Sequence, residues 1–123
     1  LTSTLKRHHQ EGQLTLSASN EKDMYQFEAA EIVFIKSENN YIEVRYLKEG
    51  KLRSELIRTT LKKTEELLEL PFLRIHRSFI VNLNFVSKVT GNAQGMQLEL
   101  KHENETLPVS RSYLNRLREV MTS

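Results

Sequence analysis

Alternation of apolar and polar residues in the first half of the chain predicts β-structure. Residues 14–18 and 24–27 alternate on either side of a polar turn at 20–23, which predicts a hairpin. Residues 32–35 form a continuous apolar run, the pattern of a strand that is buried on both faces. Residues 41–47 alternate cleanly and predict another strand. The chain therefore opens with β-structure only.

The middle of the chain interrupts this pattern with one short helix. Residues 52–57 predict a strand with less regular alternation, and the threonines at 59–60 are suited to cap a following helix. Apolar residues at helical spacing within 61–68 supply its buried face, and Pro71 marks its end. Residues 72–83 then alternate as in a single strand, with apolar side chains mainly at odd positions.

The last third of the chain predicts further strands and a closing helix. Residues 86–89 and 96–100 form a hairpin around a glycine-containing turn at 91–95. A short strand follows at 106–109, and residues 110–121 carry apolar side chains at helical spacing. About eight to ten short strands at hairpin spacing, with one middle and one closing helix, predict a mostly β sandwich or meander.

Length and composition indicate one folded domain. The chain has 123 residues, with 38% hydrophobic and 28% charged residues and no cysteine, so disulfides and thiolate chemistry are excluded. No apolar run approaches the roughly 20 residues that cross a bilayer. We interpret residues 1–13 as a linker from a preceding domain and 14–123 as the domain itself, and we expect a cytoplasmic protein.

Positive charge is unevenly distributed along the chain. The net charge is only +2, but residues 70–98 and 106–118 contain no aspartate or glutamate, while both segments contain arginines. The acids gather elsewhere, for example at 65–69 and 99–105. A domain with one basic side is suited to the phosphate backbone of a nucleic acid.

The sequence offers no convincing catalytic or metal site. His76 is the one histidine within the folded pattern, whereas a zinc site needs three or four ligands. Ser78 lies two residues away, without a nucleophile elbow or an orienting acid. Gly91 and Gly95 match no phosphate-binding loop and are explained by turns. We therefore expect no enzyme, no metal, no cofactor and no small-molecule substrate.

Residues 74–78 concentrate groups that bind phosphate or base edges. Arg74, His76, Arg77 and Ser78 bring two guanidinium groups, an imidazole and a hydroxyl together in an apolar framework. The planar fork of arginine matches phosphate oxygens or the O6/N7 edge of guanine. The alternative is that these are solvated charges or partners in salt bridges within the domain.

Three further segments carry candidate groups with structural alternatives. Asn39 and Asn40 suit adenine recognition, but asparagine also fills turns. Arg111 follows Ser110, a natural helix cap, and either enters a groove or pairs within the domain. Thr60 and Lys62 at the start of the middle helix either hold a phosphate or cap and solvate that helix.

Set in order, these segments resemble the LytTR family of bacterial DNA-binding domains. The most specific match is the run F-L-R-I-H-R-S-F-I-V-N, which is combined with P-V-S-R-S-Y near the C-terminus. The resemblance covers residues 14–120, and the matching segments are 32–37, 39–42, 60–62, 72–82 and 107–114.

The resemblance implies an elongated stack of antiparallel sheets with about ten short strands, a short middle helix and a C-terminal helix. It also implies that loops, and not a helix-turn-helix, enter successive major grooves of double-stranded DNA. By this resemblance Asn40, Arg77 and Arg111 contact bases. The residues expected at phosphates are Lys36, Asn39, Thr60, Lys62, His76, Ser78 and Ser112.

Domains of this family act as output modules of bacterial transcription regulators, chiefly response regulators of two-component systems. The resemblance therefore implies a receiver domain or membrane-spanning sensor upstream. It also implies that two copies bind paired direct repeats in promoters, as a dimer on DNA. Two alternatives remain at this point. One is a β-rich protein-interaction module with a basic face, and the other is a small-ligand sensor domain.

Overall fold

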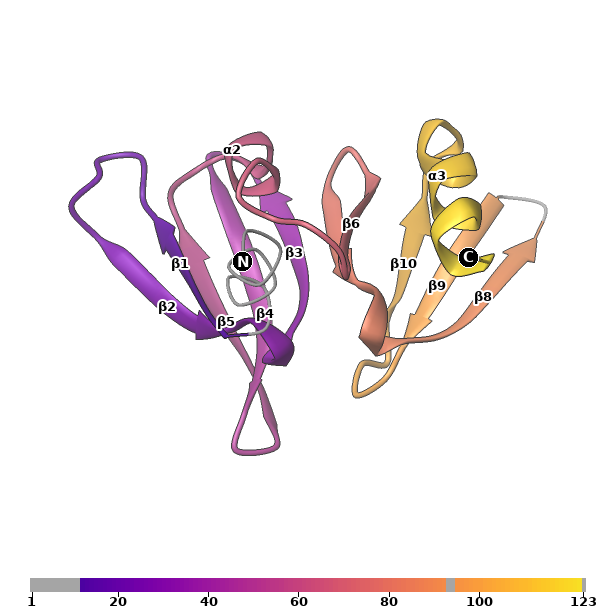
Figure 1. The fold of residues 1–123 in the computed structure, drawn as a ribbon, viewed down its shortest axis with the longest axis horizontal. Helices are drawn as coiled ribbons and strands as arrows, with labels where there is room; N and C mark the ends of the chain where they lie inside the picture. Colours follow the sequence, from indigo (N-terminus) through magenta and orange to yellow (C-terminus); the bar gives the residue numbers. More distant parts are fainter. Residues whose placement is uncertain (1–11, 93–94, 123) are drawn as a thin grey trace, which may run out of the picture.

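The computed structural model describes residues 12–92 and 95–122, which form three layers built mainly of β-strands (Figure 1). The prediction of a mostly β stack of antiparallel sheets with two helices is confirmed. The elements in chain order are β1 (Gln13–Ser17), β2 (Met24–Glu28), η1 (Ala29–Glu31), β3 (Ile32–Glu38), β4 (Tyr41–Lys48), β5 (Lys51–Ile57), α2 (Leu61–Glu65), β6 (Phe72–His76), β7 (Phe79–Asn82), η2 (Leu83–Phe85), β8 (Val86–Asn92), β9 (Gly95–Leu100), β10 (Thr106–Val109) and α3 (Arg111–Thr122).

A five-stranded antiparallel sheet in the order β5-β4-β3-β7-β6 forms the middle layer. Its central strand β3 pairs with β4 on one side and β7 on the other. Val33, Phe34 and Ile35 of this strand are at most 2% exposed, and they divide between two separate cores on opposite faces of the sheet. The apolar run at 32–35 is therefore explained by burial on both faces.

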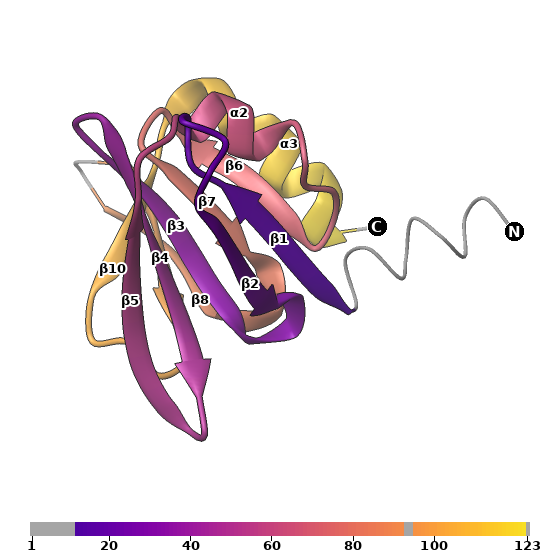
Figure 2. The same cartoon turned by 90° about the vertical axis from the view of Figure 1, so that its left-hand side faces the viewer.

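The β1–β2 hairpin and α2 cover one face of this sheet. Leu14 and Leu16 from β1, Phe27 from β2 and Leu61 from α2 pack in one core with Ile42 of β4. Figure 2 shows the hairpin in front of the central strands, with α2 at its upper end. These elements supply the first outer layer.

The three-stranded sheet β10-β9-β8 and helix α3 cover the opposite face. Leu98 of β9, Leu107 of β10 and Leu117 of α3 are at most 2% exposed and pack with Val81 of the central sheet. The same core takes in the half-buried side chain of Phe79. No helix among the described residues is long and apolar enough to span a membrane.

The expectation of one strand over residues 72–83 is wrong. The structure divides this segment into β6 and β7, which pair with each other in antiparallel fashion around a turn at Arg77 and Ser78. The register shifts between Arg74 and His76, so the turn is preceded by an irregularity in the strand. The glycine-containing turn expected at 91–95 lies partly outside the described residues, since 93–94 are not described.

Candidate nucleic-acid interface

Four segments that carry predicted site residues meet along one edge of the molecule. The β3–β4 turn lies beside the β6–β7 turn, because Lys36 is paired with Phe79 and Ser37 N–H donates to the Ser78 carbonyl at 2.9 Å. The start of α3 lies beside the end of β6, where Ser110 N–H donates to the Ile75 carbonyl at 2.9 Å. The upper side of the view in Figure 1 shows these turns together with α2 and the start of α3.

The β3–β4 turn displays the two asparagines. Asn39 has φ 57°, a left-handed conformation that asparagine adopts more readily than most residues. Asn39 therefore has a structural reason for its place, while its side chain remains exposed. Asn40 is exposed as well, and Lys36 below the turn lies 3.4 Å from Glu38 in a partly solvated ion pair. Such a surface pair is weak and leaves the ammonium available to another anion.

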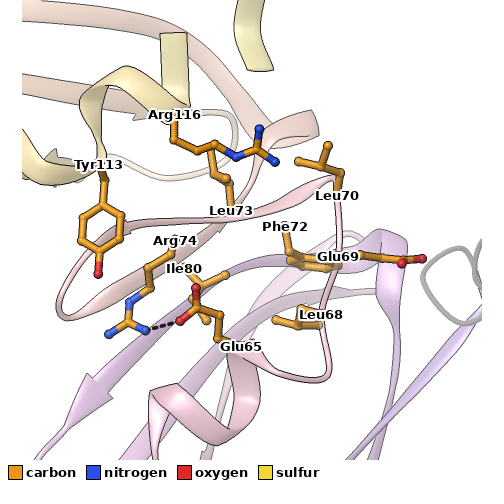
Figure 3. A pocket seen from close by; sticks show the side chains of 10 residues that line it. All are labelled: Glu65, Leu68, Glu69, Leu70, Phe72, Leu73, Arg74, Ile80, Tyr113 and Arg116. Carbon is orange, nitrogen blue, oxygen red and sulfur yellow. Dashed lines mark hydrogen bonds and ion pairs between the residues drawn. The ribbon is translucent and has the colours of Figure 1, made fainter. Parts of the chain in front are cut away.

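Arg74 holds the β6–β7 turn in place from within. Its Nε donates to the His76 carbonyl at 2.8 Å, and its Nη2 donates to the Arg77 carbonyl at 2.8 Å. Its Nη1 contacts Glu65 Oε1 of α2 at 2.6 Å, the interaction drawn in Figure 3. The Arg74 side chain is only 14% exposed, so its donors are directed into the protein. For Arg74, the alternative of a salt bridge within the domain is therefore the observed one.

His76 is held as a neutral donor by its surroundings. Its Nδ1 accepts a hydrogen bond from Ser78 N–H at 3.0 Å, which requires an unprotonated nitrogen at that position. Burial, together with the charges of Arg77 and Arg74, lowers the pKa of His76 below its ordinary value of 6.5. The remaining Nε2–H can then donate to an acceptor such as a phosphate oxygen.

Arg77 and Arg111 are exposed arginines without an acidic partner. Within the described parts of the chain, neither has a carboxylate within 4.0 Å. Arg77 occupies the tip of the β6–β7 turn, and Arg111 is the first residue of α3. Two guanidinium groups at element ends on one edge are free to bind an external anion or a base edge.

The starts of the two helices complete this edge. The Thr60 hydroxyl accepts a hydrogen bond from Lys63 N–H at 3.1 Å, so Thr60 is the N-cap of α2, as one of its two interpretations predicted. Its own O–H proton remains able to donate to another group. Lys62 and Ser112 are exposed in the first turns of α2 and α3. All ten predicted site residues therefore lie on the connected segments of this edge.

Two residues of the F-L-R-I-H-R-S-F-I-V-N run have structural roles that sequence reasoning did not specify. A salt bridge of Arg74 was considered, but its partner Glu65 and its hydrogen bonds to the His76 and Arg77 carbonyls were not singled out; we call these three interactions the Arg74 clamp. Asn82 is 1% exposed and donates through Nδ2 to the Ile32 carbonyl at 2.9 Å, while its Oδ1 accepts from Asn84 N–H at 3.0 Å. Asn82 thus anchors the end of β7 to β3.

A pocket of about 630 Å³ lies near this edge, between α2 and α3. Figure 3 shows Arg74 and Glu65 on one side of it and Tyr113 and Arg116 of α3 on the other. Among the described residues, no group of three or more histidine, aspartate or glutamate side chains is arranged to hold a metal ion. The edge therefore displays hydrogen-bond donors and cations for an external ligand.

Comparison with known proteins bears on the fold and the family of this chain. The family model of the LytTr DNA-binding domain matches residues 22–122. A response regulatory protein of Vibrio cholerae is 29% identical over 113 residues, which cover 91% of this chain and 42% of that protein. The fold is similar to that of a LytTr DNA-binding domain from Bacillus cereus, with a TM-score of 0.71, 22% identity and coverage of 91% of this chain and 98% of the other. The chain belongs to the LytTR family of DNA-binding domains.

Proposed function

We propose that this chain is the output domain of a bacterial response regulator and that it reads double-stranded DNA through the edge described above. The observation that carries the proposal concerns the guanidinium groups of Arg77 and Arg111. Both are exposed, lie on neighbouring segments and have no carboxylate partner among the described residues. Family membership supports DNA as the ligand. The arrangement supports loops as the reading elements, inserted into successive major grooves.

Base contacts are assigned to the three exposed side chains with the most suitable chemistry. Arg77 and Arg111 offer planar forks that match the O6/N7 edge of guanine, and Asn40 offers the amide that matches adenine. Each projects from a turn or from the first residue of a helix, where a side chain can extend beyond the surface. Side chains at such positions can reach base edges within a groove.

Phosphate contacts are assigned to the groups that surround these three. Neutral His76 supplies one N–H, and the hydroxyls of the edge supply further donors to phosphate oxygens. Lysines contribute positive charge and release counterions on binding. The proposed phosphate set consists of Lys36, Asn39, Thr60, Lys62, His76, Ser78 and Ser112.

The whole protein is proposed to be longer than this domain. The chain spans 42% of the length of the response regulatory protein of Vibrio cholerae. We therefore place a receiver or sensor domain upstream of β1 and the assembled regulator in the cytoplasm. Two copies are proposed to bind paired repeats in promoters, without catalysis, metal or cofactor.

Binding to DNA is tested with the purified 123-residue chain. A cognate duplex is first selected from a random 30-base-pair library, and affinity is then measured by fluorescence anisotropy at several salt concentrations. With about four to six phosphates neutralised, log K against log salt is expected to have a slope of roughly −4 to −5. A flat salt dependence, or selection of no sequence, would contradict DNA reading and favour a protein-interaction module.

A further inference from the structure

We propose that Arg58, stacked on Tyr41, is an additional phosphate-binding residue of this interface. The proposal rests on the proposed DNA binding. It adds a contact to DNA at a position between the β3–β4 turn and α2. Arg58 follows β5, whose last residue Ile57 is paired with Ile42 of β4. This pairing places Arg58 at the same end of the sheet as Asn40.

The Arg58 side chain is held by an aromatic ring. Its guanidinium carbon lies 5.8 Å from the centroid of the Tyr41 ring, within the range of a cation–π contact. A guanidinium that lies over a ring still presents N–H groups to other acceptors. Tyr41 directly follows Asn40, so the stacked cation is adjacent to a proposed base contact.

The backbone at Arg58 is also held by hydrogen bonds from the β1–β2 hairpin. Ser19, at the tip of the β1–β2 hairpin, donates to the Arg58 carbonyl through its backbone N–H at 2.7 Å and through its hydroxyl at 2.6 Å. Arg58 is exposed, and across residues 12–92 and 95–122 no carboxylate lies within 4.0 Å of its guanidinium. Its charge is therefore oriented but not neutralised within the domain.

An oriented and unpaired cation is suited to a phosphate, because less side-chain freedom is lost when the contact forms. Thr60 and Lys62 follow two and four residues later and are assigned to phosphates as well. Arg58 would thus extend the phosphate-binding run from the start of α2 toward the β3–β4 turn. Its ligand is one phosphate of the DNA backbone.

The test uses Arg58→Ala and Arg58→Lys, with Arg53→Ala as the matched control. Arg53 is an exposed arginine within β5, five residues before Arg58, which corresponds to roughly 17 Å of extended chain. Loss of one phosphate contact should reduce the salt slope by about 0.9 and the affinity roughly eightfold at about 0.1 M salt. Arg58→Lys should keep the slope, and Arg53→Ala should change neither quantity.

A double-mutant cycle with Tyr41 tests the stacking. Tyr41→Phe keeps the ring and should retain affinity, whereas Tyr41→Leu should weaken binding in the wild-type background and add little in the Arg58→Ala background. Thermal melts accompany each variant, so that only folded proteins are compared. Additive losses from Tyr41→Leu and Arg58→Ala would overturn the stacking.

The same measurements separate this proposal from the proposed function. If the wild-type chain binds the selected duplex and Arg77→Ala lowers its discrimination, while Arg58→Ala behaves as Arg53→Ala does, the Arg58 proposal alone is overturned. If the wild-type chain binds no duplex with a salt-dependent affinity, both proposals are overturned.

Discussion

The clamp formed by Arg74 leads to a prediction that distinguishes a residue that positions the β6–β7 turn from a residue that contacts DNA. Arg74→Ala removes two charge-assisted hydrogen bonds to the carbonyls of His76 and Arg77 and one ion pair with Glu65. We expect this variant to keep its fold but to lose the defined shape of the β6–β7 turn. DNA recognition should then weaken even though no proposed DNA-contacting side chain has been changed.

The magnitude follows from the three interactions. Hydrogen bonds that involve a charged group contribute about 1.5–3 kcal/mol each, and the turn carbonyls can partly recover water when the clamp is lost. The ion pair adds less than about 1 kcal/mol, because Glu65 is 45% exposed. We therefore expect a loss of about 3 kcal/mol in the free energy of unfolding, or roughly 10 °C in Tm.

Thermal melts and anisotropy titrations of three variants check this reasoning. Arg74→Lys keeps the charge but cannot span both carbonyls, so it should lose nearly as much stability and discrimination while retaining non-specific affinity. Arg116→Ala is the control from the other side of the same pocket. Arg116 is exposed and lies 3.7 Å from Glu119, so its loss should change stability by less than about 0.5 kcal/mol. Unchanged stability of Arg74→Ala would refute the clamp, and weaker DNA binding with unchanged stability would indicate that Arg74 contacts DNA itself.

Three further predictions concern other parts of the domain. Thr60→Ala and Lys62→Ala should weaken binding to cognate and unrelated duplexes alike, with an additional loss of about 1 kcal/mol of stability for the N-cap Thr60; relaxed preference at a single base position in an anisotropy series would contradict the phosphate assignment. Asn82→Ala should lower the free energy of unfolding by about 2 kcal/mol, because it leaves the buried Ile32 carbonyl without this donor, and should leave the DNA affinity of the folded protein unchanged. Burial raises the pKa of the Glu103 carboxyl more than neighbouring Arg45 lowers it. The folded state therefore binds the carboxyl proton of Glu103 more tightly than the unfolded state does. The stability that this proton contributes is lost as the pH rises from about 4.5 through the raised pKa. In chemical denaturation at several pH values, the stability of wild type relative to Glu103→Gln should therefore fall over that window, and a rise would contradict the assignment.

Most of the fold could be predicted from residue periodicity, because burial imposes it directly. The run at 32–35 is apolar at every position since both faces of β3 are covered, and the alternation in β1 follows from its single buried face. The division of 72–83 into two strands could not be predicted, because the alternation of apolar residues continues across the turn. Leu73, Ile75, Phe79 and Val81 keep the same parity across the turn, and the turn contains no glycine, proline or asparagine to mark it.

The segments of the candidate site could be predicted from the sequence, but the contacts within them could not. The clamp of Arg74 joins backbone carbonyls in its own turn to a carboxylate nine residues earlier, and no local spacing encodes that combination. Arg58 was not singled out, because its relation to Tyr41 depends on the pairing of β4 with β5. Such interactions follow from tertiary packing, which periodicity alone does not specify.

Base recognition is proposed to rest on Arg77 and Arg111. The most direct measurement is the ratio of cognate to scrambled duplex affinity for Arg77→Ala, Arg77→Lys, Arg111→Ala and Arg111→Lys, beside thermal melts of each variant. A lost bidentate contact to guanine should cost about 1–3 kcal/mol at the matched base, while stability should stay within about 0.5 kcal/mol. The lysine variants should retain much of the non-specific affinity and still lose discrimination. Folded variants that keep the wild-type ratio of cognate to scrambled affinity would contradict base recognition by Arg77 and Arg111.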